Sequence, residues 1–121
     1  VDKNTKEVQG VFSPKFCKAF FPELKNEVPP FHAITLKVYR ECSEFVHGNK
    51  IVIDRIPNKL EYSKDLFYEW NTKANTIKRI ILFSFCLRYL KHLKDEDVAK
   101  VASTITEEFK SIAQITTIIN K

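Results

Sequence analysis

The chain has 121 residues, 44% of them hydrophobic and 29% charged, which is typical of a single folded domain rather than a disordered chain. It contains only two glycines, Gly10 and Gly48, which argues against a β-sandwich or barrel with many tight turns. The net charge of +5 is spread along the chain, without the basic and aromatic clusters of a nucleic-acid platform. We therefore predict an all-α helical bundle of about five helices and expect no nucleic-acid partner.

The N-terminal segment predicts an arm followed by a short helix. Residues 1–11 are polar and follow no hydrophobic period, so we expect a flexible arm before a single domain over 12–121. Ser13 is a good N-cap and Pro14 suits the first helical position, whereas Pro22 ends the helix. The apolar face of this helix consists of Phe16, Cys17, Phe20 and Phe21.

A second helix is predicted from 31 to 48, because apolar residues recur there at helical spacing and Gly48 then favours a stop. A strand over 33–40 is the alternative, since apolar and polar residues also alternate in that stretch. Residues 50–56 are rich in β-branched side chains but have no partner strand, so we expect a loose, extended crossover over 48–60. The helical apolar stripe consists of Phe31, Ile34, Val38, Cys42, Phe45 and Val46.

Ser63 predicts the N-cap of a third helix, in which Trp70 is expected to fill the core. Residues 71–76, NTKANT, predict a break, with Asn75 or Thr76 capping a new helix. One long helix through this segment is the alternative.

The segment over about 76–94 predicts the buried central helix of the bundle. Residues 80–87 are apolar except for Ser84, and a helix that is apolar on nearly all sides lies inside a bundle or a membrane. The run is too short to span a membrane, and Arg79 and Arg88 flank it.

The last helix is predicted to start at Asp95, because Asp95, Glu96 and Asp97 place negative charge at the positive end of the helix dipole. Its expected core positions follow a 3.6-residue period: Val98, Ala102, Ile105, Phe109 and Ile112. The β-branched end of the chain, ITTIIN, is expected to fray.

The sequence offers little chemistry. There is no glycine-rich phosphate loop, no paired metal motif and no expected cofactor. The three cysteines, Cys17, Cys42 and Cys86, lie on apolar stripes where a buried thiol is inert, so we predict no enzyme. The chain begins at Val1 and contains no Met, which favours a processed, secreted form, with a cytoplasmic location as the alternative.

The remaining candidate sites lie on the surface. Two basic pairs flank the central helix, and exposed tyrosines would serve as anchors for a partner protein. The predicted partner-binding residues are Lys78, Arg79, Arg88, Lys91, Tyr62 and Tyr68.

Trp70, residues 78–82, residues 89–90 and Leu93 resemble the second and third helices of interferon-gamma-like cytokines. Residues 94–96, 104–105 and 107–108 resemble the start of that family's fourth helix. The resemblance implies a secreted cytokine that binds a receptor and forms a homodimer. The family's last two helices and basic tail have no counterpart after Lys121, so no receptor contacts are carried over.

Two other resemblances imply different partners. In Bcl-2-like proteins an Arg-containing motif precedes a central apolar helix, as 75–79 precede 80–93 here, although Lys78 replaces the usual Gly. That family binds amphipathic helices in a groove. Residues 14–20 resemble abalone sperm lysin-type proteins, which bind egg coats or membranes. We expect first a secreted cytokine-like ligand, with a groove-type regulator and a basic sperm-type protein as alternatives; contact with a membrane surface stays open.

Overall fold

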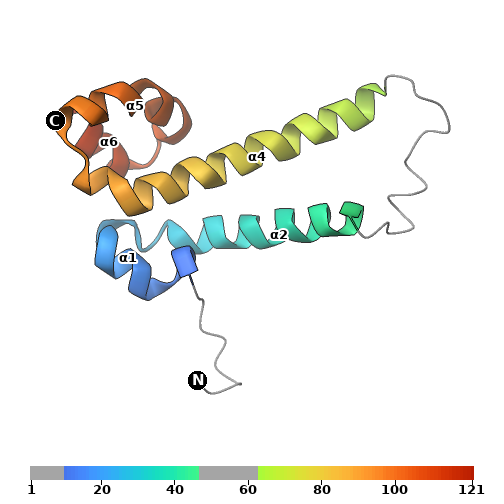
Figure 1. Ribbon diagram of the computed structural model, residues 1–121, viewed down its shortest axis with the longest axis horizontal. Helices are drawn as coiled ribbons and strands as arrows, with labels where there is room; N and C mark the ends of the chain where they lie inside the picture. Colours follow the sequence, from blue (N-terminus) through green and yellow to red (C-terminus); the bar gives the residue numbers. More distant parts are fainter. Residues whose placement is uncertain (1–9, 47–62) are drawn as a thin grey trace, which may run out of the picture.

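In the computed structural model the described residues are 10–46 and 63–121, with the side chains of Phe45 and Val46 left aside. These residues form five α-helices and no strand, which confirms the predicted all-α fold. Two long antiparallel helices, α2 (Val28–Val46) and α4 (Lys64–Tyr89), form a hairpin (Figure 1). Three shorter helices gather at one end of it: α1 (Pro14–Phe20), α5 (Asp95–Phe109) and α6 (Ala113–Ile119).

The N-terminal helix forms as predicted. The Ser13 hydroxyl oxygen accepts a hydrogen bond from the Phe16 amide at 3.0 Å, and Pro14 opens α1. The helix ends at Phe20, and Pro22 starts the short 3₁₀ helix η2 (Pro22–Leu24). The predicted flexible N-terminal segment, residues 1–11, lies mostly outside the described residues, but its last two residues belong to the 3₁₀ helix η1 (Gly10–Phe12). The helical structure therefore includes residues predicted to belong to the flexible N-terminal segment.

The second helix starts at Val28 rather than near 31, because the two prolines that follow occupy its first turn, where a missing N–H costs nothing. Residues 33–40 are helical, so the alternative of a strand is wrong. Among the described side chains of the expected apolar stripe, Phe31 is buried and Val38 and Cys42 are half-buried, whereas Ile34 is 40% exposed. The crossover predicted over 48–60 and the β-like residues 50–56 lie outside the described residues.

The break expected at NTKANT is also wrong, because α4 runs unbroken from Lys64 to Tyr89. Ser63 caps it as predicted. Three polar side chains of the segment donate to carbonyl oxygens one turn earlier: Asn71 to Phe67 at 2.9 Å, Thr72 to Tyr68 at 3.0 Å and Thr76 to Thr72 at 3.0 Å. This back-bonding satisfies them within a continuous helix, so they do not cap a new one.

The predicted central helix is buried only in part. Phe83, Cys86 and Leu87 are buried, whereas Ile81 is 62% exposed. The helix also ends earlier than expected, since the 3₁₀ helix η3 (Leu90–His92) follows Tyr89. The apolar run is therefore half core and half surface.

The final predicted helix divides into two. Asp95, Glu96 and Asp97 form the first turn of α5 as expected, and Ile105 and Phe109 are buried. A turn at residues 110–112 then starts α6, whose Ile115 is 0% exposed. The end of the chain, expected to fray, is instead folded onto the core.

The core lies at one end of the hairpin, which we call the base. Phe31 of α2 stacks on Phe83 of α4 with ring centroids 4.0 Å apart and planes at 8°. Phe109 of α5 meets both rings edge-on, at 6.0 and 6.2 Å. These three rings join α2, α4 and α5, while α1 and α6 close the remaining sides.

Candidate functional site

The first basic pair predicted to bind a partner contacts α5 instead. The Lys78 ammonium lies 2.8 Å from one carboxylate oxygen of Glu108. Arg79 donates to the main-chain oxygen of Glu108 at 2.7 Å and to its other carboxylate oxygen at 3.3 Å. The hydrogen bond from Lys78, with Arg79 nearby, lowers the pKa of Glu108 below its ordinary value. Both cations therefore help to hold α5 on α4.

Arg79 also packs against the aromatic core. Its guanidinium lies 5.2 Å from the ring centroid of Phe109 and 5.7 Å from that of Phe31. The negative ring faces favour a cation there. Arg79 thus marks the border between the base and the remainder of the hairpin.

The second basic pair, Arg88 of α4 and Lys91 of η3, has the same kind of role near the C-terminal end of α4. The Arg88 guanidinium lies 3.9 Å from the ring centroid of Phe20 in α1. Lys91 binds both carboxylate oxygens of Glu23, at 2.9 and 3.0 Å, and lies over the Phe21 ring. The two contacts tie α1 and η2 to the end of α4.

Of the two tyrosines predicted as anchors for a partner protein, the structure describes one. Tyr68 is 73% exposed on α4, and Tyr62 lies outside the described residues. Trp70, expected in the core, is 68% exposed. The prediction for Trp70 is wrong because nothing in the described structure packs over this part of α4.

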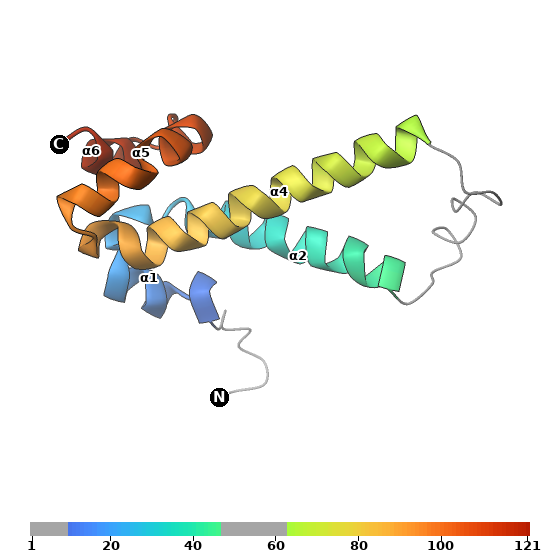
Figure 2. The same ribbon diagram turned by 45° about the horizontal axis from the view of Figure 1, so that its top comes forward.

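The exposed part of the hairpin forms a distinct region, which we call the arm: residues 32–46 of α2 and 64–82 of α4. None of its described side chains is buried. The two helices lie closest beside the base and diverge toward their far ends (Figures 1 and 2). A pair of helices that diverges cannot bury two apolar stripes against each other, so much of the apolar surface stays in water.

One apolar stripe on α4 has a regular spacing, and we call it the arm stripe: Trp70, Ala74, Ile77 and Ile81. The intervals of four, three and four residues are those of the a and d positions of a coiled coil. Ile77 is 37% exposed and Ile81 62%. The stripe therefore presents a helix-packing surface to solvent.

A hollow of about 430 Å³ lies beside the arm stripe, and we call it the arm groove. One of its walls is α4 and the other is α2, which contributes Cys42. Tyr39, one turn before Cys42 on α2, is 73% exposed. The lining residues are Cys42, Leu66, Glu69, Trp70, Lys73, Ala74 and Ile77.

A second hollow between the arm helices, of about 340 Å³, is more polar. Lys73 of α4 and Glu41 of α2 form an ion pair of 2.7 Å at its edge. The hydrogen bond from Lys73 lowers the pKa of Glu41. This ion pair links the two arm helices.

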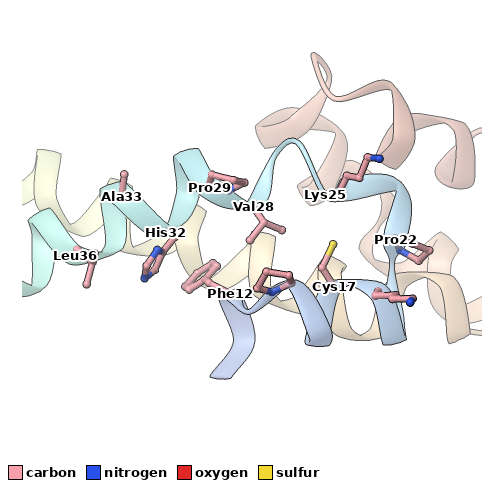
Figure 3. A pocket seen from close by; sticks show the side chains of 11 residues that line it. Phe12, Cys17, Pro22, Lys25, Val28, Pro29, His32, Ala33 and Leu36 are labelled. Atoms are coloured by element: carbon pink, nitrogen blue, oxygen red, sulfur yellow. The ribbon is translucent and has the colours of Figure 1, made fainter. Parts of the chain in front are cut away.

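A third hollow, of about 460 Å³, lies between η1, α1 and the start of α2 (Figure 3). Phe12 and Val28 line it, and the Phe12 ring lies 5.7 Å from that of His32, centroid to centroid. The thiol of Cys17 donates to the carbonyl oxygen of Phe21 at 3.2 Å, and burial raises its pKa. A protonated, buried thiol is a poor nucleophile, so this pocket offers space for apolar groups rather than a reactive centre.

All three cysteines are described, and all are free thiols. Burial raises the pKa of the Cys86 thiol to about 12. Cys42 differs from the others, because it is only half-buried and lies in the arm groove. Within 10–46 and 63–121 there is no group of three metal-ligating side chains, and no helix there is long and apolar enough to cross a membrane.

Comparison of the chain with family models, curated proteins and solved structures gives no match. The resemblances to cytokines, Bcl-2-like proteins and sperm lysins therefore stay predictions.

Sequence reasoning missed the arm stripe as a site. The signal was present in the spacing of Trp70, Ala74, Ile77 and Ile81, but a predicted break at 71–76 divided these residues between two helices. Continuity of α4 is what aligns them on one face.

Proposed function

We propose that this chain is a non-enzymatic protein-interaction domain that binds its partner through the arm. The base holds the fold together, and the arm presents the binding surface. The single observation that supports this most is the exposed arm stripe, since aromatic residues such as Trp70 carry much of the binding energy at protein interfaces.

The contacts of the two basic pairs within the protein also support this separation between a base that holds the fold and an arm that binds the partner. Lys78 and Arg79 hold α5, and Lys91 holds η2, so these cations have structural partners already. By contrast, Tyr39, Tyr68 and Trp70 of the arm are 73%, 73% and 68% exposed, so their side chains contribute little to the packing of the described fold. A stable monomer does not need the arm stripe, whereas a binding protein does.

The test compares proteins that co-purify with three forms of the chain from its cells of origin. The forms are the natural chain, a Trp70→Ser/Ile81→Ser variant and a Tyr89→Ser variant. Tyr89 is a matched control, because it is an aromatic residue on the same helix, 48% exposed, beside the base. Circular dichroism first establishes that all three are equally helical.

We expect the arm variant to lose specific co-purifying proteins that the natural chain and the Tyr89 variant retain. Equal recovery with all three forms would contradict a binding role for the arm.

A further inference from the structure

We propose that the arm groove seats one amphipathic α-helix of a partner protein, with acidic residues along both edges of that helix, as a third helix beside α2 and α4. This inference rests on the proposed function and names the class of partner. It follows from three features of the arm: the spacing of its apolar residues, the shape of the groove and the charges at its edges.

The spacing favours a helix over an irregular segment. The arm stripe has the a and d pattern into which side chains of a facing helix insert as knobs into holes. From Trp70 to Ile81 the stripe rises about 16 Å at 1.5 Å per residue, which suits a partner segment of two to three heptads. A flat or extended ligand would not use this period.

The groove supplies a second wall. Cys42 lines it from α2, and Tyr39 extends the same flank of α2 by one turn. A helix seated there contacts both arm helices and covers Trp70. The result is a three-helix layer, in which apolar surface that α2 and α4 leave in water is buried.

Three of the positions that flank the stripe on α4 are basic, although Glu69 also lines the groove. In the register set by the stripe, the flanking e and g positions of α4 hold Lys64, Lys73 and Lys78 and no acidic residue. No described residue forms an ion pair with Lys64, and the Lys78 side chain is 56% exposed although it binds Glu108. Lys73 binds Glu41, but an ammonium has three donors and can bind a second carboxylate. Acidic residues on the partner helix would pair with these lysines.

A second copy of this chain is disfavoured by the same positions. In a parallel pair of α4 helices, Lys73 of one copy would face Lys78 of the other, since a g position meets the e position five residues later. By symmetry, two lysines would face each other on both sides of the interface between the two α4 helices. In an antiparallel pair the flanks would supply no acidic partner for the lysines either.

The experiment uses the full chain and two designed peptides of three heptads. Both have Leu at every a and d position and lack Trp; one has Glu at every e and g position and the other has Lys. Like charges at these flanks keep each peptide from pairing with itself. Binding is measured by fluorescence anisotropy of a dye on the peptide, and the rate at which Cys42 reacts with a thiol reagent is measured with and without peptide.

We expect the Glu peptide to bind at least about ten-fold more tightly than the Lys peptide at low salt, with the difference shrinking as salt is raised. It should also slow labelling of Cys42 several-fold. A Lys64→Glu/Asn71→Glu variant should reduce the preference for the Glu peptide and leaves the Lys78–Glu108 pair intact. The matched control is Lys100→Glu/Ser103→Glu, the same change of charge on α5, which should not alter it.

Three results would overturn the inference: binding of neither peptide, equal binding of both, or an equal effect of the two charge variants. If neither peptide binds but Trp70→Ser/Ile81→Ser still removes co-purifying proteins, the arm binds another class of partner and only this inference fails. A reversible dimer in sedimentation equilibrium that the same arm variant abolishes would identify a second copy as the occupant instead.

Discussion

Arg79 donates from a single guanidinium nitrogen to both the main-chain oxygen and the carboxylate of Glu108, at 2.7 and 3.3 Å. The accepted carbonyl belongs to the last turn of α5, where helix carbonyls have no partner within the helix. Arg79 thus closes the end of α5 and fixes it on α4. The contact lies where the buried base gives way to the exposed arm.

Replacing Arg79 tests this contact. Arg79→Met keeps an unbranched side chain against the rings of Phe31 and Phe109 but removes the hydrogen bonds. We expect the free energy of unfolding to fall by about 1–2 kcal/mol, since hydrogen bonds to charged groups are stronger than neutral ones. Urea unfolding monitored by circular dichroism measures it. Lys78→Met is the control and should cost less, because Lys78 reaches only the carboxylate; an equal or larger loss would contradict the special role of Arg79.

Glu108 predicts a pH dependence of stability. Its pKa is lowered from the ordinary 4.5 in the folded chain, chiefly by the hydrogen bond from Lys78. The unfolded chain therefore binds this proton first, so the stabilisation is complete above about pH 4.5 and is lost as pH falls through the lowered pKa. We expect Glu108→Gln to be less stable than the natural chain at neutral pH and to lose less stability on acidification. Urea midpoints over an acid series measure this, and parallel curves for the two proteins would refute it.

Truncation to alanine should reduce the stability of the chain greatly at one aromatic residue of α4 and very little at another. Phe83 is 0% exposed and stacked on Phe31, so Phe83→Ala should destabilise the chain by about 3–5 kcal/mol or prevent folding. Trp70 is 68% exposed, and Trp70→Ala should change stability by less than about 1 kcal/mol. Thermal and urea unfolding give both values. A large loss for Trp70→Ala would mean that Trp70 belongs to the core after all.

The cysteines should differ in accessibility. Cys17 is 2% exposed and Cys86 0%, whereas Cys42 is half-buried in the arm groove. We expect a thiol reagent to label Cys42 first in the native chain, and the other two only when the base opens in denaturant. Mass spectrometry of the digested protein identifies the labelled residue. Early labelling of Cys86 would contradict the packing of α4 in the base.

The local signals in the sequence were the reliable ones. The cap at Ser13 and the acidic first turn at Asp95 each act within one turn of helix, and both are where the pattern predicts them. The all-α class also followed from composition and period. These features depend on neighbours in sequence, which the sequence displays directly.

The wrong predictions concerned features that depend on residues far away in the sequence, which local patterns do not reveal. An apolar period shows that a face can be buried, but not that another surface lies opposite it; hence Trp70 and Ile34 were expected in the core and are exposed. Asn75 and Thr76 look like caps, but in this chain the side chain of Thr76 bonds one turn back within a continuous helix. The candidate site depended on both errors, because it consists of exposed apolar residues on one uninterrupted helix.

The most direct test of the open arm uses Trp70, the only tryptophan in the chain. Its fluorescence is measured in the free, folded protein with increasing acrylamide as quencher, and again after unfolding in urea. We predict an emission typical of indole in water and nearly the same quenching in both states. A blue-shifted emission protected from acrylamide in the folded chain would show that the arm stripe is already covered and would contradict an open binding surface.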